Sequence, residues 1–154
     1  MNSTDNIEKA RPIGRLLRLL FGAFVLFSAV PYYFIVPTDV VIQTILVTLG
    51  LVVFYILLDL VIHKVFPTIH PGAGAILANT PILLMWLLGR DAIQLGALTF
   101  LGISLVLTGL RGDKGCEVMS IPGLIFNRHT RLACFFFSPV DWLEKKIMEK
   151  VKNL

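Results

Sequence analysis

The chain has 154 residues, of which 56% are hydrophobic and 16% are charged, and its formal net charge is +4. Soluble domains carry about 25% charged residues, and a fold of this size could not bury so much apolar surface in water. The composition therefore excludes an ordinary soluble domain and predicts one compact unit in a lipid bilayer. Basic residues near the ends of apolar segments are typical of membrane topology, so the positive charge does not indicate nucleic-acid binding.

Four apolar segments follow one another along the chain. About 20 apolar residues of helix cross a bilayer core. Proline or glycine interrupts the apolar pattern at Pro37, Pro67 and Gly89, where each would end a helix. After a tail at 1–12, the sequence predicts an all-α integral membrane domain over residues 13–110. Its four transmembrane helices are expected at about residues 13–36, 40–66, 71–88 and 92–110.

The lysines and arginines indicate how these helices are oriented. Of the 14 Lys and Arg residues, four lie within residues 1–18 and eight within 111–154, while Lys64 and Arg90 lie in two different loops. Four spans place both tails on the side of the membrane where Lys64 lies, and basic residues favour the cytoplasmic side. We therefore predict a multi-pass protein of the cell (inner, cytoplasmic) membrane with both termini in the cytoplasm.

The predicted cytoplasmic tail, residues 111–154, ends in a helix-forming segment. Ser138, Pro139 and Asp141 are typical of a helix start. After them, apolar residues recur at three- and four-residue spacing with Trp142 beside them, and lysines occupy other faces: Val140, Leu143, Ile147, Val151 and Leu154 form the apolar stripe. This pattern predicts a membrane-associated amphipathic helix at about 139–152 that binds anionic lipid head groups. A helix packed on the protein's own cytoplasmic loops is the alternative.

A turn is expected earlier in this tail. Ile121–Leu124 has proline and then glycine at its centre, which fits a type II turn. Apolar residues at 124–126 and 132–137 flank a polar stretch between them. The tail could therefore contain a small cytoplasmic hairpin before the amphipathic helix.

Cys116, His129 and Cys134 also lie in the tail. They are the candidate residues of a thiol or metal sensor. A zinc site requires four ligands at characteristic spacing, however, and a reducing cytoplasm disfavours a stable disulfide. We therefore predict no bound metal and no cofactor, and interpret the two cysteines as small residues of a membrane-proximal fold.

A cluster of polar residues is expected inside the membrane domain: Arg18, Tyr55, Asp59, His63 and Asn79. Tyr55, Asp59 and His63 are four residues apart and share one helix face. A carboxylate in a transmembrane helix is costly and usually faces the bundle with a partner. Arg18, Asp59 and Asn79 all fall roughly 8–12 Å from the cytoplasmic ends of their helices. This common depth predicts an Arg18–Asp59 ion pair, which could fix helix register or serve as an ion or proton site.

The sequence contains neither a glycine-rich phosphate-binding loop nor a serine or cysteine nucleophile elbow. No enzymatic activity is therefore predicted. The favoured function is that of a non-enzymatic accessory, assembly or interaction protein, acting by contact with other membrane proteins or by self-association. A small oligomeric transporter or channel that uses Asp59 and His63 is the alternative, and the thiol or metal sensor is a weaker one.

Two short stretches resemble a known family. Arg15-Leu16-Leu17-Arg18 with Gly22, and Leu105-Val106-Leu107-Thr108-Gly109 with a later cysteine, are similar to the opening and the end of the YgaP-type transmembrane domain. The resemblance implies a small bacterial inner-membrane protein of undefined role, often found beside a sulfurtransferase domain. This chain departs from that pattern, because Cys116 follows Gly109 by seven residues and two more helices and a long tail are expected.

Overall fold

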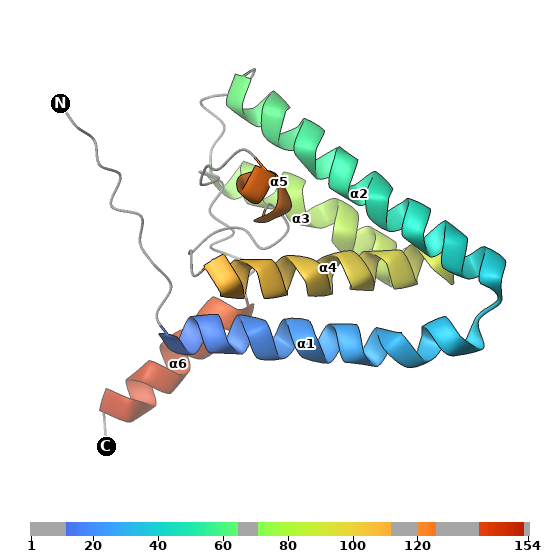
Figure 1. The fold of residues 1–154 in the computed structure, drawn as a ribbon. Helices are drawn as coiled ribbons and strands as arrows, with labels where there is room; N and C mark the ends of the chain where they lie inside the picture. Colours follow the sequence, from blue (N-terminus) through green and yellow to red (C-terminus); the bar gives the residue numbers. More distant parts are fainter. Residues whose placement is uncertain (1–11, 65–70, 112–119, 126–138, 153–154) are drawn as a thin grey trace.

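The computed structural model describes residues 12–64, 71–111, 120–125 and 139–152 (Figure 1). These residues form α1 (Pro12–Ile35), α2 (Thr38–Lys64), α3 (Pro71–Leu88), α4 (Ala92–Arg111), α5 (Ser120–Ile125) and α6 (Pro139–Lys152). No strand occurs among the described residues, so the predicted all-α class is confirmed for this part of the chain.

The four longer helices alternate in direction. In Figure 1, α1 and α3 run one way, and α2 and α4 run the other. The first residues of α1 and α3 and the last residues of α2 and α4 therefore lie at one end, together with α5 and α6, which we call the tail end. The opposite end carries the α1–α2 and α3–α4 connections and is called the turn end.

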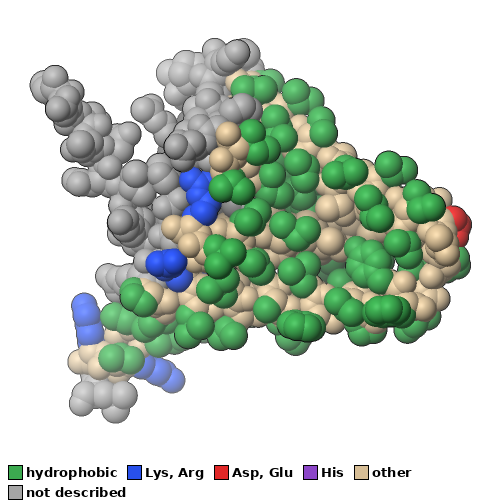
Figure 2. All heavy atoms as spheres, viewed as in Figure 1, with side chains coloured by type: hydrophobic (Ala, Val, Ile, Leu, Met, Phe, Trp, Pro, Cys, Tyr) green, Lys and Arg blue, Asp and Glu red, His purple; other side chains and the backbone are tan. Residues whose placement is uncertain are grey.

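Three helical stretches are long and apolar enough to cross a membrane: Pro12–Ile35, Thr38–Val61 and Ala92–Arg111. The stretch Ile76–Leu88 of α3 is also apolar but shorter. Large apolar side chains cover the outside of the bundle (Figure 2), and Phe27 of α1 is 75% exposed. Such a surface is costly in water and is compatible with a lipid environment.

Helix α4 is the centre of the bundle, because α1, α2 and α3 each pack against it. The apolar core joins α2, α3 and α4, and the rings of Tyr55 and Phe100 stack within it at a centroid distance of 5.1 Å. The remaining buried core residues are Leu51, Ala78, Ile82 and Ala97.

Glycines allow α1 and α4 to approach closely. A Cβ atom on Gly22 would lie 2.7 Å from Val106 Cγ2 and 2.8 Å from the Val106 backbone nitrogen. A Cβ on Gly102 would lie 2.8 Å from Leu26, and one on Gly109 would lie 2.8 Å from Leu19. Small residues at such crossings let helix backbones pack together in lipid, where no hydrophobic effect drives the helices together.

The segment expected to form a type II turn is helical instead. Residues Ile121–Leu124 lie within α5. Proline is tolerated there because Pro122 lies in the first turn, where backbone N–H groups have no partner within the helix. The proposed hairpin also needed residues 126–138, which lie outside the described residues.

Candidate functional site

The structure buries three of the predicted site residues completely. Arg18 on α1 and Tyr55 and Asp59 on α2 are each 0% exposed. Tyr55 and Asp59 share the inward face of α2 with Thr44 and Leu51, which are also buried. Spacing of three or four residues brings these side chains onto one side of the helix. Asp59 therefore faces the protein and not its outer surface.

Tyr55 connects α2 to α3. Its hydroxyl donates a hydrogen bond to the backbone carbonyl of Ala78 at 2.6 Å. Asn79 is the next residue and is half-buried. The structure thus brings Tyr55 close to the turn of α3 that carries Asn79.

Arg18 lies elsewhere in the bundle. Helix α1 packs against α4 and α6, and Figure 1 shows the tail ends of α1 and α2 well apart, with α4 between them. The helices that carry Arg18 and Asp59 therefore pack on α4 from separate positions, and the Arg18–Asp59 ion pair stays a prediction. Each of the two side chains takes part in an interaction.

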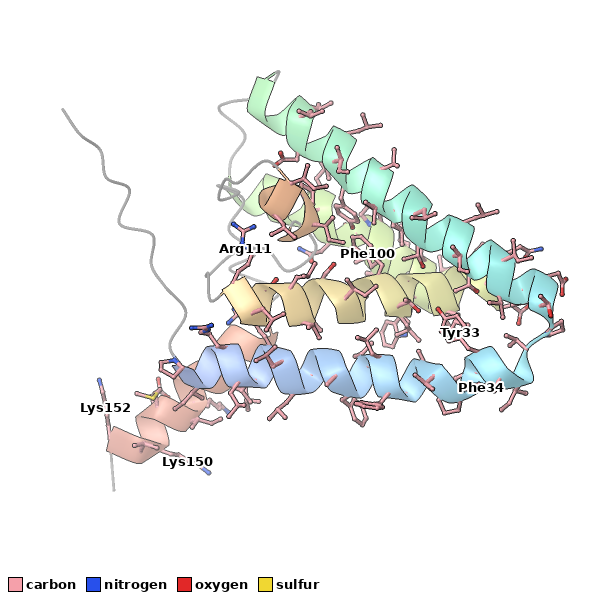
Figure 3. All side chains as sticks on the ribbon, in the orientation of Figure 1. Tyr33, Phe34, Phe100, Arg111, Lys150 and Lys152 are labelled. Atoms are coloured by element: carbon pink, nitrogen blue, oxygen red, sulfur yellow. The ribbon has the colours of Figure 1, made fainter. Side chains whose placement is uncertain are left out.

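Several polar contacts that the sequence did not single out join α1 to α4. The hydroxyls of Tyr33 and Thr99 are 2.6 Å apart (Figure 3). At the other end of α1, Arg15 donates hydrogen bonds to the carbonyls of Gly109 and Leu110 at 3.2 and 3.1 Å. These are terminal carbonyls of α4, and a cation there is favoured by the helix dipole. The only sequence feature that pointed to this contact is the position of Arg15 at the start of one predicted span.

Helix α4 also carries two buried hydroxyl residues. Ser104 and Thr108 are 0% and 3% exposed, and the Thr108 hydroxyl donates to the Ser104 carbonyl at 2.8 Å. Thr48 of α2 donates to the carbonyl of Thr44 within its own helix at 2.9 Å and approaches the Gly96 carbonyl of α4 at 3.4 Å. Bonds within a helix satisfy the Thr108 and Thr48 hydroxyls without requiring a ligand.

The side chains of the other predicted site residues lie outside the described part of the chain. His63 lies on α2, but its side chain is outside the described residues, as are Cys116, His129 and Cys134. Within the part of the chain that the structure describes, no group of three or more His, Cys, Asp and Glu residues could hold a metal ion. The sensor hypothesis therefore stays a prediction from the sequence.

These features define a helical protein with three candidate membrane spans and polar side chains buried between its helices. No protein family, curated protein or solved structure matches the chain. The YgaP-type resemblance accordingly stays a prediction, and function has to be argued from the residues themselves.

Proposed function

We propose that the chain is a four-span membrane protein with both tails in the cytoplasm, acting as a non-enzymatic accessory or assembly protein. The alternating directions of α1 to α4 support four spans, with α3 as the shortest (Figure 1). Arg111, Lys150 and Lys152 lie at the tail end (Figure 3), which agrees with a cytoplasmic side rich in basic residues.

The observation that carries the accessory function is the use of polar side chains as contacts between helices. Tyr55 bonds to α3, Tyr33 bonds to Thr99 of α4, and Arg15 bonds to the end of α4. Hydrogen bonds of this kind hold helices together in lipid. The outside of the same bundle is apolar, so its surface is suited to contact with lipid and with other transmembrane helices.

A reporter experiment tests the orientation. A cytoplasm-active reporter fused after Leu154 should be active, and the same reporter inserted at Arg90 in the α3–α4 turn should be inactive. The physical reason is the concentration of Lys and Arg in the two tails. A periplasm-active reporter at the same two positions is the control and should give the reverse pattern. Equal sidedness at both positions would contradict the four-span topology.

Copurification tests the function. The tagged full chain, extracted at native abundance in mild detergent, should elute in a complex larger than its own 17.1 kDa mass plus detergent. The same partners should be absent when an unrelated tagged four-span protein is extracted in parallel. A monomer with no partner enriched over that control would refute the accessory function.

The helix α6 extends this proposal to the lipid interface. It packs against α1, and Val151 is 56% exposed on the stripe that also contains Leu143 and Ile147. Figure 3 shows Lys150 and Lys152 extending to opposite sides of α6. Lysines that flank an apolar stripe can reach head groups while the stripe enters the acyl boundary. We propose that this surface binds anionic lipid.

Val151→Glu should therefore weaken the contact between α6 and lipid. Burying a valine side chain contributes about 1.5 kcal/mol or more, so the change should shift the helix measurably toward water. In the full chain with Trp86→Phe, fluorescence of the remaining Trp142 reports the contact through quenching by brominated anionic lipid. Glu149→Asp, which keeps the charge at an exposed position, is the control and should leave quenching unchanged. Equal quenching in Val151→Glu would show that the stripe does not enter lipid.

A small oligomeric transporter or channel is the second candidate function. The observation in its favour is the complete burial of Asp59 on a helix long and apolar enough to span a membrane. Buried carboxylates at such positions often belong to proton or ion pathways. Proton flux in liposomes that is abolished by Asp59→Asn, in a variant that remains folded, would favour this function over the accessory one.

A further inference from the structure

Helix α5 enters the bundle. Pro122 is fully buried, and Ile121 packs against the core cluster that contains Tyr55 and Phe100. A helix of six residues is too short to be stable by itself in water. Its position therefore depends on the contacts that it makes with the longer helices.

Those contacts place α5 between two diverging helices. It contacts both α2 and α4, and Figure 1 shows it in the space between them near the tail end. In Figure 3, Phe100 lies farther from the tail end than α5 does. Helix α5 therefore packs against α2 and α4 on the tail side of the Tyr55–Phe100 stack.

Asp59 belongs to the same part of α2. It lies one turn beyond Tyr55 toward the tail end, on the same buried face. α2 diverges from α4 in this region (Figure 1), and α5 packs against both helices. The complete burial of Asp59 is consistent with cover from α5.

We propose that α5 is a re-entrant plug, which enters the membrane domain from the cytoplasmic side and closes the access of cytoplasmic water to the Asp59 carboxyl. The proposal rests on the orientation proposed above, with the tail end in the cytoplasm. Withdrawal of α5 hydrates Asp59 and makes the carboxyl reachable by protons and water-soluble reagents. The buried state and the hydrated state then differ in the position of one short helix.

The two sides of α5 provide matched variants. Ile121 faces the core, whereas Leu124 is 52% exposed. Ile121→Ser removes the apolar contact that holds the plug, and Leu124→Ser makes the same chemical change on the exposed side. Ile121→Val is a milder change that keeps the chain folded if the serine variant does not fold.

The test uses a water-soluble carbodiimide with a small amine on the full chain in sealed inside-out membrane vesicles, with peptide mass spectrometry as the readout. We expect slow modification of Asp59 in the wild type and in Leu124→Ser. Modification should be at least tenfold faster in Ile121→Ser and measurably faster in Ile121→Val. A thermal midpoint in detergent close to that of the wild type shows that the faster reaction does not come from global unfolding.

Other carboxylates in the same sample report the orientation. Glu149 is exposed on α6 at the tail end, and Asp39 and Asp91 are exposed at the turn end. Rapid modification of Glu149, with Asp39 and Asp91 protected, supports the proposed orientation. The reverse pattern overturns that orientation, and the Ile121 comparison is then made in right-side-out vesicles.

Two results overturn the plug itself. One is modification of wild-type Asp59 as fast as that of Glu149, because the carboxyl would then be open to water. The other is an unchanged Asp59 rate in every folded Ile121 variant, because α5 would then not control access. Both results differ from an error in orientation. Glu149 is modified rapidly in each of them, whereas it is protected if the orientation is reversed.

Discussion

Asp59→Leu and Arg18→Leu should each lower the free energy of unfolding by about 1–3 kcal/mol, the usual cost of leaving a hydrogen-bonding group without its partner. Both residues are 0% exposed, and each has an interaction partner. Each substitution therefore removes the side chain that makes this interaction. Denaturant unfolding of the purified protein in detergent micelles measures the two losses.

The double variant decides whether the two residues are partners. Because α4 separates the tail ends of α1 and α2 (Figure 1), we expect the losses to add within about 0.5 kcal/mol, as they do for distant sites. Asp39→Asn, at an exposed position, is the control and should change stability by no more than about 0.5 kcal/mol. Recovery of stability in the Arg18→Leu/Asp59→Leu double variant would instead establish the ion pair that their common depth suggests.

Gly22→Ala should destabilise the α1–α4 pair by about 1–3 kcal/mol, which is typical of overpacking. The added methyl group would lie 2.8 Å from the backbone nitrogen of Val106 and 2.7 Å from its side chain. A rotamer change can move the side chain, but only a shift of the whole helix can move the backbone. Thermal unfolding in detergent should show a lower midpoint. Stability should also depend less on the Tyr33–Thr99 contact, which joins the same two helices.

Gly50→Ala is the matched control for this prediction. It makes the same change in a membrane-length helix, but a Cβ on Gly50 has nothing within 4 Å. Alanine is favoured over glycine in helices by about 1 kcal/mol, so stability should stay the same or rise. If Gly22→Ala and Gly50→Ala gave the same change, close contact at Gly22 would not explain the packing of α1 on α4.

The sequence predicted the long helices well because two strong local signals agree. Apolar runs of membrane length end at proline, glycine or polar residues, as at Pro37 and Gly89. The predicted segments 13–36 and 71–88 differ little from α1 (Pro12–Ile35) and α3 (Pro71–Leu88). Helix ends depend on caps and on the final turn, and differences of one or two residues there carry little meaning.

The candidate site was only partly predictable. Spacing of four residues places Tyr55 and Asp59 on one face of α2, and the cost of a carboxylate in lipid turns that face inward. The depth of a residue along its own helix gives no information about which other helix packs against that residue. Arg18 was paired with Asp59 by depth alone, whereas the structure packs α1 and α2 on α4.

The sequence by itself determined that the described part of the chain is helical, that it has helices apolar enough to span a membrane, and that Asp59 faces the inside of the bundle, because hydrophobic length and helical periodicity are local properties. Only the tertiary structure decided that α4 is the central helix, since that depends on how glycines such as Gly22 and Gly96 fit the surfaces opposite them. It also decided that Ile121–Leu124 is helical and not a turn. Proline followed by glycine permits either conformation, and burial of Pro122 between longer helices selects the helix.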